Sequence, residues 1–424
     1  MQSGSHLTKN LNVVSLSIFG IGIIIGAGVY AVLGTAAGVA GDSLWLSFLF
    51  AAAVAVLTAF SYCELASMYP FAGAEYIYLK RAFPKLKLPT FLLGFVLFLA
   101  GAATAATVSH AFSGYLQNFV DAPETLVSYG LLVAVTLVNL MGIHTSSRTN
   151  LLFTAIEVAG LIAVIWFGFF HEPKRQMDFS VTTKTFTVSS LVFFVYLGFE
   201  NIVNLAEDTE EAEKNVPRAI IWSLVITTIL YVAVAIAALR LASPEVLSSS
   251  DSPLADAIKN VAPRWVNVLS AIALFSTANT ALIGLLSISR MVYGIANEGD
   301  LPKLLTKTTG QSETPVYSIL ASSFVAAIFL LLGELEILAR VSSFAALCGF
   351  FIVNSLLIGI RYKEQTIKAK FKSPLSIGRF PTLAFIGTLS VLALCTQFEF
   401  KIYFITFCML ALGALVYFLT KRFS

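Results

Sequence analysis

Charged residues are scarce in this chain of 424 residues: aspartate, glutamate, lysine and arginine make up 12%, whereas hydrophobic residues make up 57%. Soluble globular domains usually carry about 25% charged residues, because their surfaces face water. The shortage therefore excludes an ordinary soluble protein. The apolar residues gather in runs of about 20, long enough for a helix to cross the hydrocarbon core of a bilayer. We predict an all-α integral membrane protein.

The patterns of catalytic and metal chemistry are also missing. The sequence has no Gly-x-x-x-x-Gly-Lys-Ser/Thr loop for phosphate, so we do not expect it to hydrolyse ATP. No Ser/His, Cys/His or His-Glu-x-x-His arrangement supports an intramembrane enzyme. The four cysteines lie inside apolar runs without metal-ligand spacing: Cys63, Cys348, Cys395 and Cys408. We expect no enzymatic activity, no metal and no cofactor.

The apolar runs predict about 12 transmembrane helices. No loop between them is long enough to build a soluble core, so we expect a single transmembrane domain over residues 1–424. The predicted spans are 12–38, 43–67, 89–119, 126–143, 149–170, 187–206, 218–241, 265–296, 315–333, 335–361, 381–397 and 401–420.

Basic residues set the expected orientation. If the N-terminus and every second loop face the cytoplasm, most of the 27 lysines and arginines fall on that side, as the positive-inside rule requires. We therefore predict a multi-pass protein of the plasma membrane with both termini cytoplasmic. The first apolar run follows Lys9 directly and is longer than the apolar core of a signal peptide, so we do not expect its cleavage.

Two of the spans are interrupted. The first contains the glycine-rich stretch 20–28, and the sixth contains Gly198 followed closely by Glu200. Glycine weakens a helix, and a carboxylate is costly at membrane depth. Interrupted spans five helices apart are typical of inverted repeats with a binding site near the midplane. The repeats would cover about 11–170 and 186–361, with extra helices at about 380–420. Alternatively, the glycines only let helices pack closely.

Four stretches of sequence give the chain a resemblance to a known family. They are Gly22-Ile23-Ile24-Ile25-Gly26-Ala27-Gly28-Val29-Tyr30; Tyr62-Cys63-Glu64-Leu65-Ala66 with Pro70, Gly73 and Glu75-Tyr76-Ile77-Tyr78; Gly198-Phe199-Glu200 with Asn204-Leu205-Ala206-Glu207-Asp208 and Asn215-Val216-Pro217-Arg218-Ala219-Ile220; and Ser289-Arg290-Met291-Val292-Tyr293 with Glu298-Gly299-Asp300-Leu301-Pro302 and Thr314-Pro315. In this order and spacing the chain resembles the amino acid–polyamine–organocation (APC) superfamily. The resemblance implies secondary active transport of amino acids by alternating access, on a five-plus-five inverted-repeat core of the LeuT type with two additional helices.

The chain departs from the family pattern at two positions. Ala74 stands where a second glycine is common, and Glu157 in the fifth span stands where many relatives carry a lysine. In proton-coupled relatives that lysine takes the place of a sodium ion. The substitution leaves the coupling ion open between a proton and sodium.

The interrupted spans carry groups suited to an amino acid. A broken helix leaves N–H groups unpaired in one half and C=O groups unpaired in the other, and glycine lets a ligand reach the backbone. We expect the substrate carboxylate at the first-span N–H groups and its ammonium group at the sixth-span carbonyls. The resemblance implies the same arrangement, makes Phe194 an aromatic lid and places small third-span residues, including Ala100, at the pocket. The predicted binding residues are Ile24, Ile25, Gly26, Ala27, Gly28, Gly101, Thr104, Ala105, Phe194, Val195, Leu197 and Gly198.

Ionisable side chains inside spans are candidates for ion coupling, because a buried charge is costly and protonation removes that cost. Glu200, just past the sixth-span break, is the first candidate for proton coupling, and Glu157 is the second. Ser276 and Thr277 in the eighth span would supply oxygen ligands if sodium is the coupling ion. Alternatively, these two hydroxyls bond only to the preceding turn of their own helix.

The leading interpretation is an amino acid transporter that works by proton-coupled symport or by exchange (antiport). No acidic residue is placed to meet a basic side chain, so neutral amino acids are favoured, with a cationic amino acid or polyamine exchanger as the alternative. A membrane amino acid sensor that does not transport is a further alternative. The expected partners are the amino acid, a proton or sodium, and the lipid bilayer; nothing points to nucleic acid.

The acidic run 207–213 falls in a predicted cytoplasmic loop. We expect it to form a solvated face rather than a metal site. Its expected partners are Lys80, Arg81 or Arg148, with Glu64 and Glu75 joining the same intracellular network.

Overall fold

A computed structural model describes residues 11–117, 119–172, 184–250, 252–309, 314–332, 335–363 and 369–423. Within these residues the chain is almost entirely helical, and its regular strands form one short antiparallel hairpin of β1 (Ser376–Ile377) and β2 (Phe380–Pro381). Helices are the expected form, because lipid offers the backbone no hydrogen-bond partner. The prediction of an all-α membrane protein is confirmed.

Each predicted span contains helical structure in the described residues. The long helices are α1 (Val13–Ala40), α2 (Leu44–Met68), α4 (Lys87–Gln117), α5 (Glu124–Leu140), α6 (Ile143–Phe170), α8 (Ala212–Leu241), α11 (Val266–Asn297), α12 (Val316–Leu332), α13 (Leu335–Tyr362), α14 (Thr382–Cys395) and α15 (Phe400–Phe423). The sixth span consists of α7 (Lys184–Phe193) and two 3₁₀ segments, η2 (Phe194–Tyr196) and most of η3 (Phe199–Asp208). The last two residues of η3 lie beyond the predicted span, in the acidic run 207–213. The connecting segments are η1 (Gly41–Ser43), α3 (Ala74–Ala82), α9 (Pro244–Ser248), α10 (Pro253–Ile258), η4 (Pro263–Trp265) and η5 (Lys303–Thr306). Among the described residues, 8 helices are long and apolar enough to cross a membrane, and α5, α12 and α14 are shorter apolar helices.

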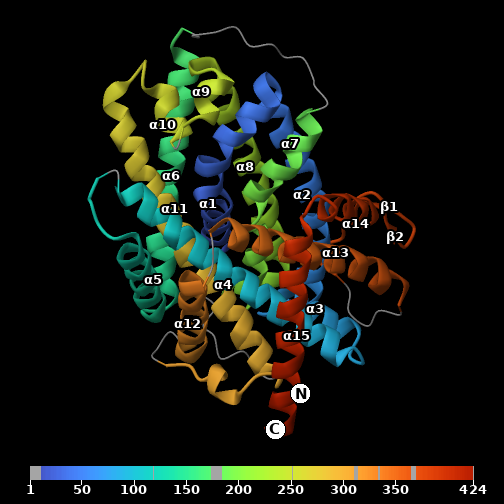
Figure 1. The fold of residues 1–424 in the computed structure, drawn as a ribbon. Coiled ribbons are helices and arrows are strands. Elements are labelled where there is room, and N and C mark those ends of the chain that lie inside the picture. Colours follow the sequence, from blue (N-terminus) through green and yellow to red (C-terminus); the bar gives the residue numbers. More distant parts are fainter. Residues whose placement is uncertain are drawn as a thin grey trace.

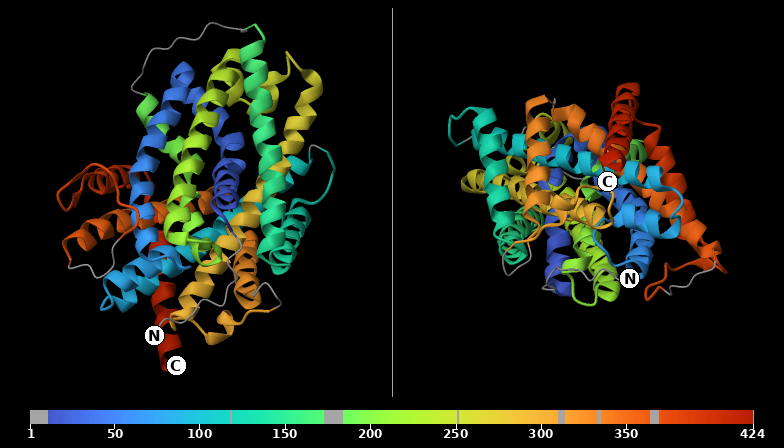
Figure 2. Two further views of the ribbon diagram at one scale, coloured as in Figure 1. Left: turned by 180° about the vertical axis from the view of Figure 1, so that it is seen from behind. Right: turned by 90° about the horizontal axis from the view of Figure 1, so that it is seen from below.

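Helix α1 lies in the middle of the bundle, packed against α6, α8 and α11 (Figure 1). Helix α4 runs obliquely across this group, and α12, α13 and α15 pack against α4. Helix α1 begins and α15 ends at the same end of the bundle, which we call the lower end (Figures 1 and 2). Helices α9 and α10 lie at the opposite, upper end. An even number of spans places the two termini on one side, as this arrangement does.

Several glycines of α1 allow close helix contacts. A β-carbon at Gly20 would lie 2.3 Å from the Ser223 Oγ of α8, and one at Gly38 would lie 2.6 Å from the Ser248 Cβ of α9. At Gly34 the nearest atom would be the Leu247 carbonyl oxygen of α9, at 2.4 Å. Small residues let helices approach where lipid supplies no driving force for association. These three glycines therefore allow close helix packing, as the alternative interpretation of the glycines proposed. Helix α9 packs on the upper half of α1 at Gly34 and Gly38.

We predict that Gly34→Ala destabilises the protein by about 1–3 kcal/mol, the usual cost of overpacking. The reason is that the new methyl group meets a backbone oxygen, which cannot rotate away. Gly130→Ala in α5 is the matched control, because nothing lies within 4 Å of its added β-carbon; there the helix should gain about 0.5–1 kcal/mol. The measurement is the melting temperature of each purified variant in detergent. Equal melting temperatures would contradict the close α1–α9 contact.

Candidate functional site

The first span breaks at Gly26, the position that the glycine pattern predicted. Gly26 has φ 35° and ψ −159°, inside an otherwise continuous α1. Two hydroxyls of α11 take up the backbone groups at this point: Ser276 Oγ donates to the Gly26 carbonyl at 2.6 Å, and Thr280 Oγ1 accepts from the Ala27 N–H at 3.2 Å. The break is therefore stabilised by a different helix.

The sixth span breaks at Gly198, which has φ 121°. Helix α7 ends five residues earlier, at Phe193, and η3 begins at Phe199. The Glu200 side chain closes the break, because its Oε2 accepts from the Gly198 N–H at 2.8 Å and its Oε1 accepts from the Asn201 side-chain amide at 3.3 Å. Both oxygens of this partly buried acid are therefore hydrogen-bonded.

The two breaks face each other across the middle of the bundle. A β-carbon at Gly28 would touch the Val195 Cα at 3.4 Å, and one at Gly198 would lie 3.1 Å from the Ile23 carbonyl oxygen. The hydroxyl of Tyr231 in α8 donates to the Ile24 carbonyl at 2.6 Å and lies 3.3 Å from the Val195 carbonyl. One side chain thus reaches a carbonyl of each broken span. The site predictions did not include Tyr231, and its only sequence signal was a lone tyrosine in the apolar run of α8.

The remaining predicted binding residues are distributed around these breaks. Ile24 and Ile25 are buried in the main apolar core, whereas Leu197 is half-buried. Ala105 belongs to a second apolar cluster, against which Ala27 packs. The Phe194 backbone forms the start of η2, but its side chain lies outside the described residues.

Gly101 and Thr104 of the third span make contacts that serve helix packing. Gly101 faces another helix, and Thr104 bonds to its own helix. A β-carbon at Gly101 would lie 2.2 Å from Ile288 Cγ2, so Gly101 serves the close contact between α4 and α11. The Thr104 hydroxyl donates to the Ala100 carbonyl of the preceding turn. Their predicted place at the pocket stays a prediction.

Comparison with known proteins identifies the family. The family model described as "Amino acid permease" matches residues 11–418. The chain belongs to the amino acid permease family. It is 26% identical to a branched-chain amino acid permease of Bacillus subtilis (strain 168), over 98% of this chain and 94% of that protein. It is 27% identical to a methylthioribose transporter of the same organism, over 98% and 94% of the two chains. It is 28% identical to a chloroplastic cationic amino acid transporter of Arabidopsis thaliana, over 86% and 68%.

The four coupling candidates of this permease have different surroundings. Ser276 bonds to the broken span, as described above, whereas the Thr277 hydroxyl donates to the Ala273 carbonyl of its own helix at 3.1 Å. Glu157 lies in the middle of α6 with 0% of its surface exposed. The Asn279 side-chain amide faces Glu157, but neither Glu157 oxygen makes a hydrogen bond of ordinary length and angle among the described residues, whereas both Glu200 oxygens do.

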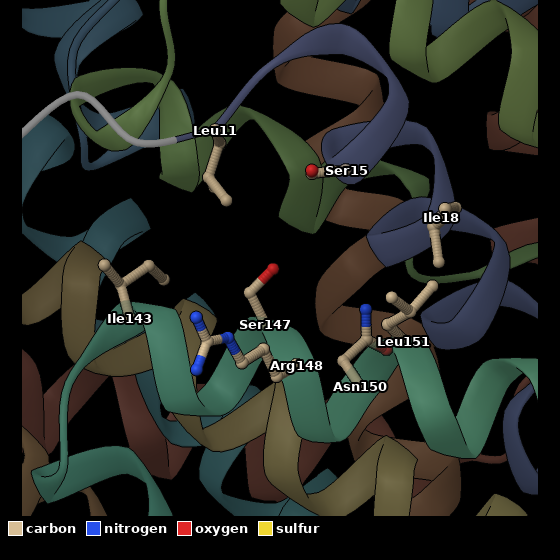
Figure 3. Close-up of a pocket in the computed structure, with 8 residues that line it drawn as sticks. All are labelled: Leu11, Ser15, Ile18, Ile143, Ser147, Arg148, Asn150 and Leu151. Atoms are coloured by element: carbon tan, nitrogen blue, oxygen red, sulfur yellow. The ribbon is translucent and has the colours of Figure 1, made fainter.

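A cavity of about 200 Å³ opens at the lower end of the permease, between the start of α1 and the first turns of α6. Figure 3 shows Ser147, Arg148 and Asn150 extending from α6 toward Leu11 and Ser15. The remaining lining residues are Ile18, Ile143 and Leu151. The cavity therefore borders the first turns of the span that carries the Gly26 break.

Beside this cavity, ion pairs hold the lower end together. Arg290 of α11 and Asp208 of η3 form a buried pair, with Nε 2.9 Å from Oδ2 and both side chains 1% exposed. Arg361 of α13 binds Glu64 of α2 through two bonds of 2.7 Å and 2.6 Å. Glu75 accepts a hydrogen bond from Tyr62. These contacts do not join Glu64 or Glu75 to the acidic run 207–213, so the expected shared intracellular network stays a prediction.

The acidic run 207–213 is the expected solvated face only in its second half, where Glu210 and Glu211 are exposed. Glu207 and Asp208 are buried, 6% and 1% exposed, because η3 packs on α11 and on the loop before α3. The expected partners were also wrong. Lys80 and Arg81 pair with Glu298 and Asp300, and the described ion pairs of the run join Asp208 to Arg290, Glu211 to Lys214 and Glu213 to Lys370. A run of like charge in sequence cannot reveal which of its members turn inward.

We predict that Gly26→Leu abolishes substrate binding by the permease while the protein remains inserted. A leucine at φ 35° is strained, and its β-carbon would lie 2.5 Å from Thr280 Oγ1. Binding is measured by scintillation proximity on protein that elutes as a single peak in size-exclusion chromatography. If the Gly26→Leu protein binds the substrate with wild-type affinity, Gly26 is not part of the binding site.

We expect the lower end to respond to pH through Glu207. Burial raises the pKa of Glu207 to about 7, although the Ala72 N–H that it binds and Arg290 act in the opposite direction. A carboxyl whose pKa rises on burial stabilises the buried arrangement when it is protonated and destabilises it when it is charged. The stability of the lower-end contacts should therefore fall as pH rises from about 4.5 to about 7, by about 1.4 kcal/mol per pH unit at most.

We predict that Glu207→Gln removes most of this pH dependence, since the amide stays neutral. Glu210→Gln is the control, because Glu210 is exposed in the same run. Melting temperatures measured between pH 5 and pH 8 give the comparison. A Glu207→Gln protein whose melting temperature falls with pH as steeply as the wild type would contradict the assignment.

Proposed function

We propose that this permease carries amino acids across the plasma membrane by alternating access, with the substrate bound between the two helix breaks. The proposal is supported mainly by the contact between the two broken spans. Gly28 lies against Val195, and the Tyr231 hydroxyl reaches a carbonyl of each span. Backbone N–H groups of residues 25–28 bind the substrate carboxylate. The carbonyls of residues 194, 195 and 197 accept from its ammonium group.

The proposed substrate is a neutral amino acid. The side chains around the breaks are apolar, as Ile24, Ile25 and Val195 are, and the branched-chain amino acid permease among the relatives fits such a pocket. Cationic amino acids are the second candidate, because one relative is a cationic amino acid transporter of Arabidopsis thaliana. Uptake of labelled leucine, competed separately with arginine and with a polyamine, separates the two classes.

The proposal includes the arrangement of the chain in the membrane. The lower end faces the cytoplasm, so both termini are cytoplasmic and the charged contacts of Arg290 and Arg361 form the inner gate. Residues 11–170 and 186–361 form inverted repeats, in which the broken spans occupy equivalent first positions, and residues 380–420 add two helices. Phe194 is the aromatic lid over the substrate.

Coupling to a proton is proposed through a buried acid, Glu200 first and Glu157 second. Glu200 touches the sixth-span break itself, so a change in its charge alters the backbone groups that hold the substrate. Ser276 and Thr277 would serve instead if sodium is the coupling ion. A charged acid at the bilayer centre costs about 2.5–3.5 kcal/mol on insertion scales, and protonation removes this cost when the site closes.

We predict that purified permease in proteoliposomes accumulates a labelled amino acid when a pH gradient is imposed, and that Glu200→Gln reduces this accumulation more than it reduces exchange at equal pH. The amide retains an oxygen for the Gly198 N–H, so the substitution tests the charge alone. Wild type and variant are assayed with and without sodium. Binding without any uptake would favour a sensor, and accumulation driven by sodium alone would refute proton coupling.

A further inference from the structure

A stripe of polar side chains follows one face of α6 from the lower cavity to the middle of the helix. Asn150, Thr154 and Glu157 are spaced by four and three residues, which places them on one helix face. They are 1%, 4% and 0% exposed. Asn150 also lines the cavity between α1 and α6, and Figure 3 shows its side chain extending from α6 into that space. The helix from Asn150 to Glu157 covers about 10 Å.

The stripe is hydrogen-bonded into α11. The Thr154 hydroxyl donates to Asn150 Oδ1 at 3.0 Å and accepts from the Asn279 side-chain amide at 3.2 Å. The Asn279 side-chain amide also faces the Glu157 carboxyl. The Asn279 Oδ1 and both Glu157 oxygens make no hydrogen bond of ordinary length and angle among the described residues. Because buried polar groups are normally hydrogen-bonded, three acceptor oxygens gathered at one place call for a further hydrogen-bond donor, such as a water molecule or a proton on the carboxyl.

Gly22 of α1 makes room for this cluster. A β-carbon there would lie 2.1 Å from Thr154 Oγ1, 2.7 Å from Asn150 Oδ1 and 2.8 Å from Asn279 Nδ2. The span that carries the Gly26 break therefore rests directly on the polar stripe. A movement of the lower half of α1 would change the surroundings of the stripe and of the cavity together.

The groups facing Glu157 supply no counter-charge. The titratable side chains near it are Tyr30 of α1 and Tyr231 of α8, which are neutral at physiological pH. The neighbour from α11 is the neutral amide of Asn279, and no lysine or arginine of the described residues acts on the carboxyl. The charged side chain of this region is Arg148, which is exposed at the cavity.

We propose that the stripe is a cytoplasmic proton port, through which Glu157 exchanges a proton with the lower cavity by way of Asn150, Thr154 and Asn279. The proposal rests on the proposed function, since it requires a proton-coupled transporter whose lower end is cytoplasmic. On uptake a hydronium ion gives its proton to a Glu157 oxygen and becomes water; on release the reverse occurs. The Thr154 hydroxyl both donates and accepts, and the amides provide the two to four polar partners that a bridging water typically needs.

The test compares three variants of the full chain in proteoliposomes of known orientation. Glu157→Gln removes the acid, and Thr154→Val removes the hydroxyl with almost no change of shape. Thr149→Val is the matched control on the same helix, because the Thr149 hydroxyl bonds to the Thr145 carbonyl of its own turn. Proton flux is followed with an enclosed pH dye, and amino acid exchange is measured at equal pH with a labelled substrate. Melting temperatures show that each variant is folded.

We expect the proton flux per amino acid carried to fall about tenfold or more in Glu157→Gln and Thr154→Val, since positioned proton-transfer groups contribute at least that much. The Thr149→Val protein should match the wild type. Unchanged proton flux in both variants would overturn the port and leave amino acid transport standing. Amino acid accumulation that depends on sodium and moves no protons would also overturn it. A wild type that exchanges no amino acid would refute the proposed function, and the port with it.

Discussion

A helix can break inside a bilayer only if neighbouring side chains satisfy the backbone groups that the break releases, because lipid offers none. In this permease Glu200 of the sixth span bonds to that span's own break at Gly198, and the other side chains come from helices that are themselves unbroken. Ser276 and Thr280 of α11 hold the break of α1, and Tyr231 of α8 reaches carbonyls on both sides of the site. The break of α1 therefore depends on contacts that form only in the assembled bundle. A substrate that displaces one of these contacts acts on α8 and α11 as well as on the broken spans.

The two ends of the bundle are held by different forces. At the upper end α9 packs on glycines of α1 through van der Waals and backbone contacts, which respond little to pH or salt. At the lower end the contacts are ionic, and Arg290 with Asp208 forms a fully buried pair. Breaking one partner of such a pair is costly, about 3–5 kcal/mol, because the other charge is left uncompensated. Opening of the lower end therefore requires these groups to find water or new partners as they separate.

Two acids inside the bundle have different surroundings. Glu200 is partly buried and fully hydrogen-bonded, with one oxygen on the Gly198 N–H and the other on Asn201, so its position follows the backbone of the sixth span. Glu157 is fully buried among neutral groups, and the neighbour that faces its carboxyl is the Asn279 side-chain amide. Its oxygens make no hydrogen bond of ordinary length and angle among the described residues.

The sequence alone determined the membrane class, the helical spans and the position of both breaks, because each depends on neighbours in the chain. Apolar runs of about 20 residues span a bilayer, and the positive φ of Gly26 and Gly198 requires glycine locally. It did not reveal the role of Tyr231, whose bond to Ile24 joins residues 207 positions apart. Nor did it reveal that Gly22 faces Thr154 and Asn279, or that Glu207 and Asp208 turn inward. These contacts were decided by the tertiary packing of α1 among α6, α8 and α11, since composition and periodicity carry no record of which helix faces which.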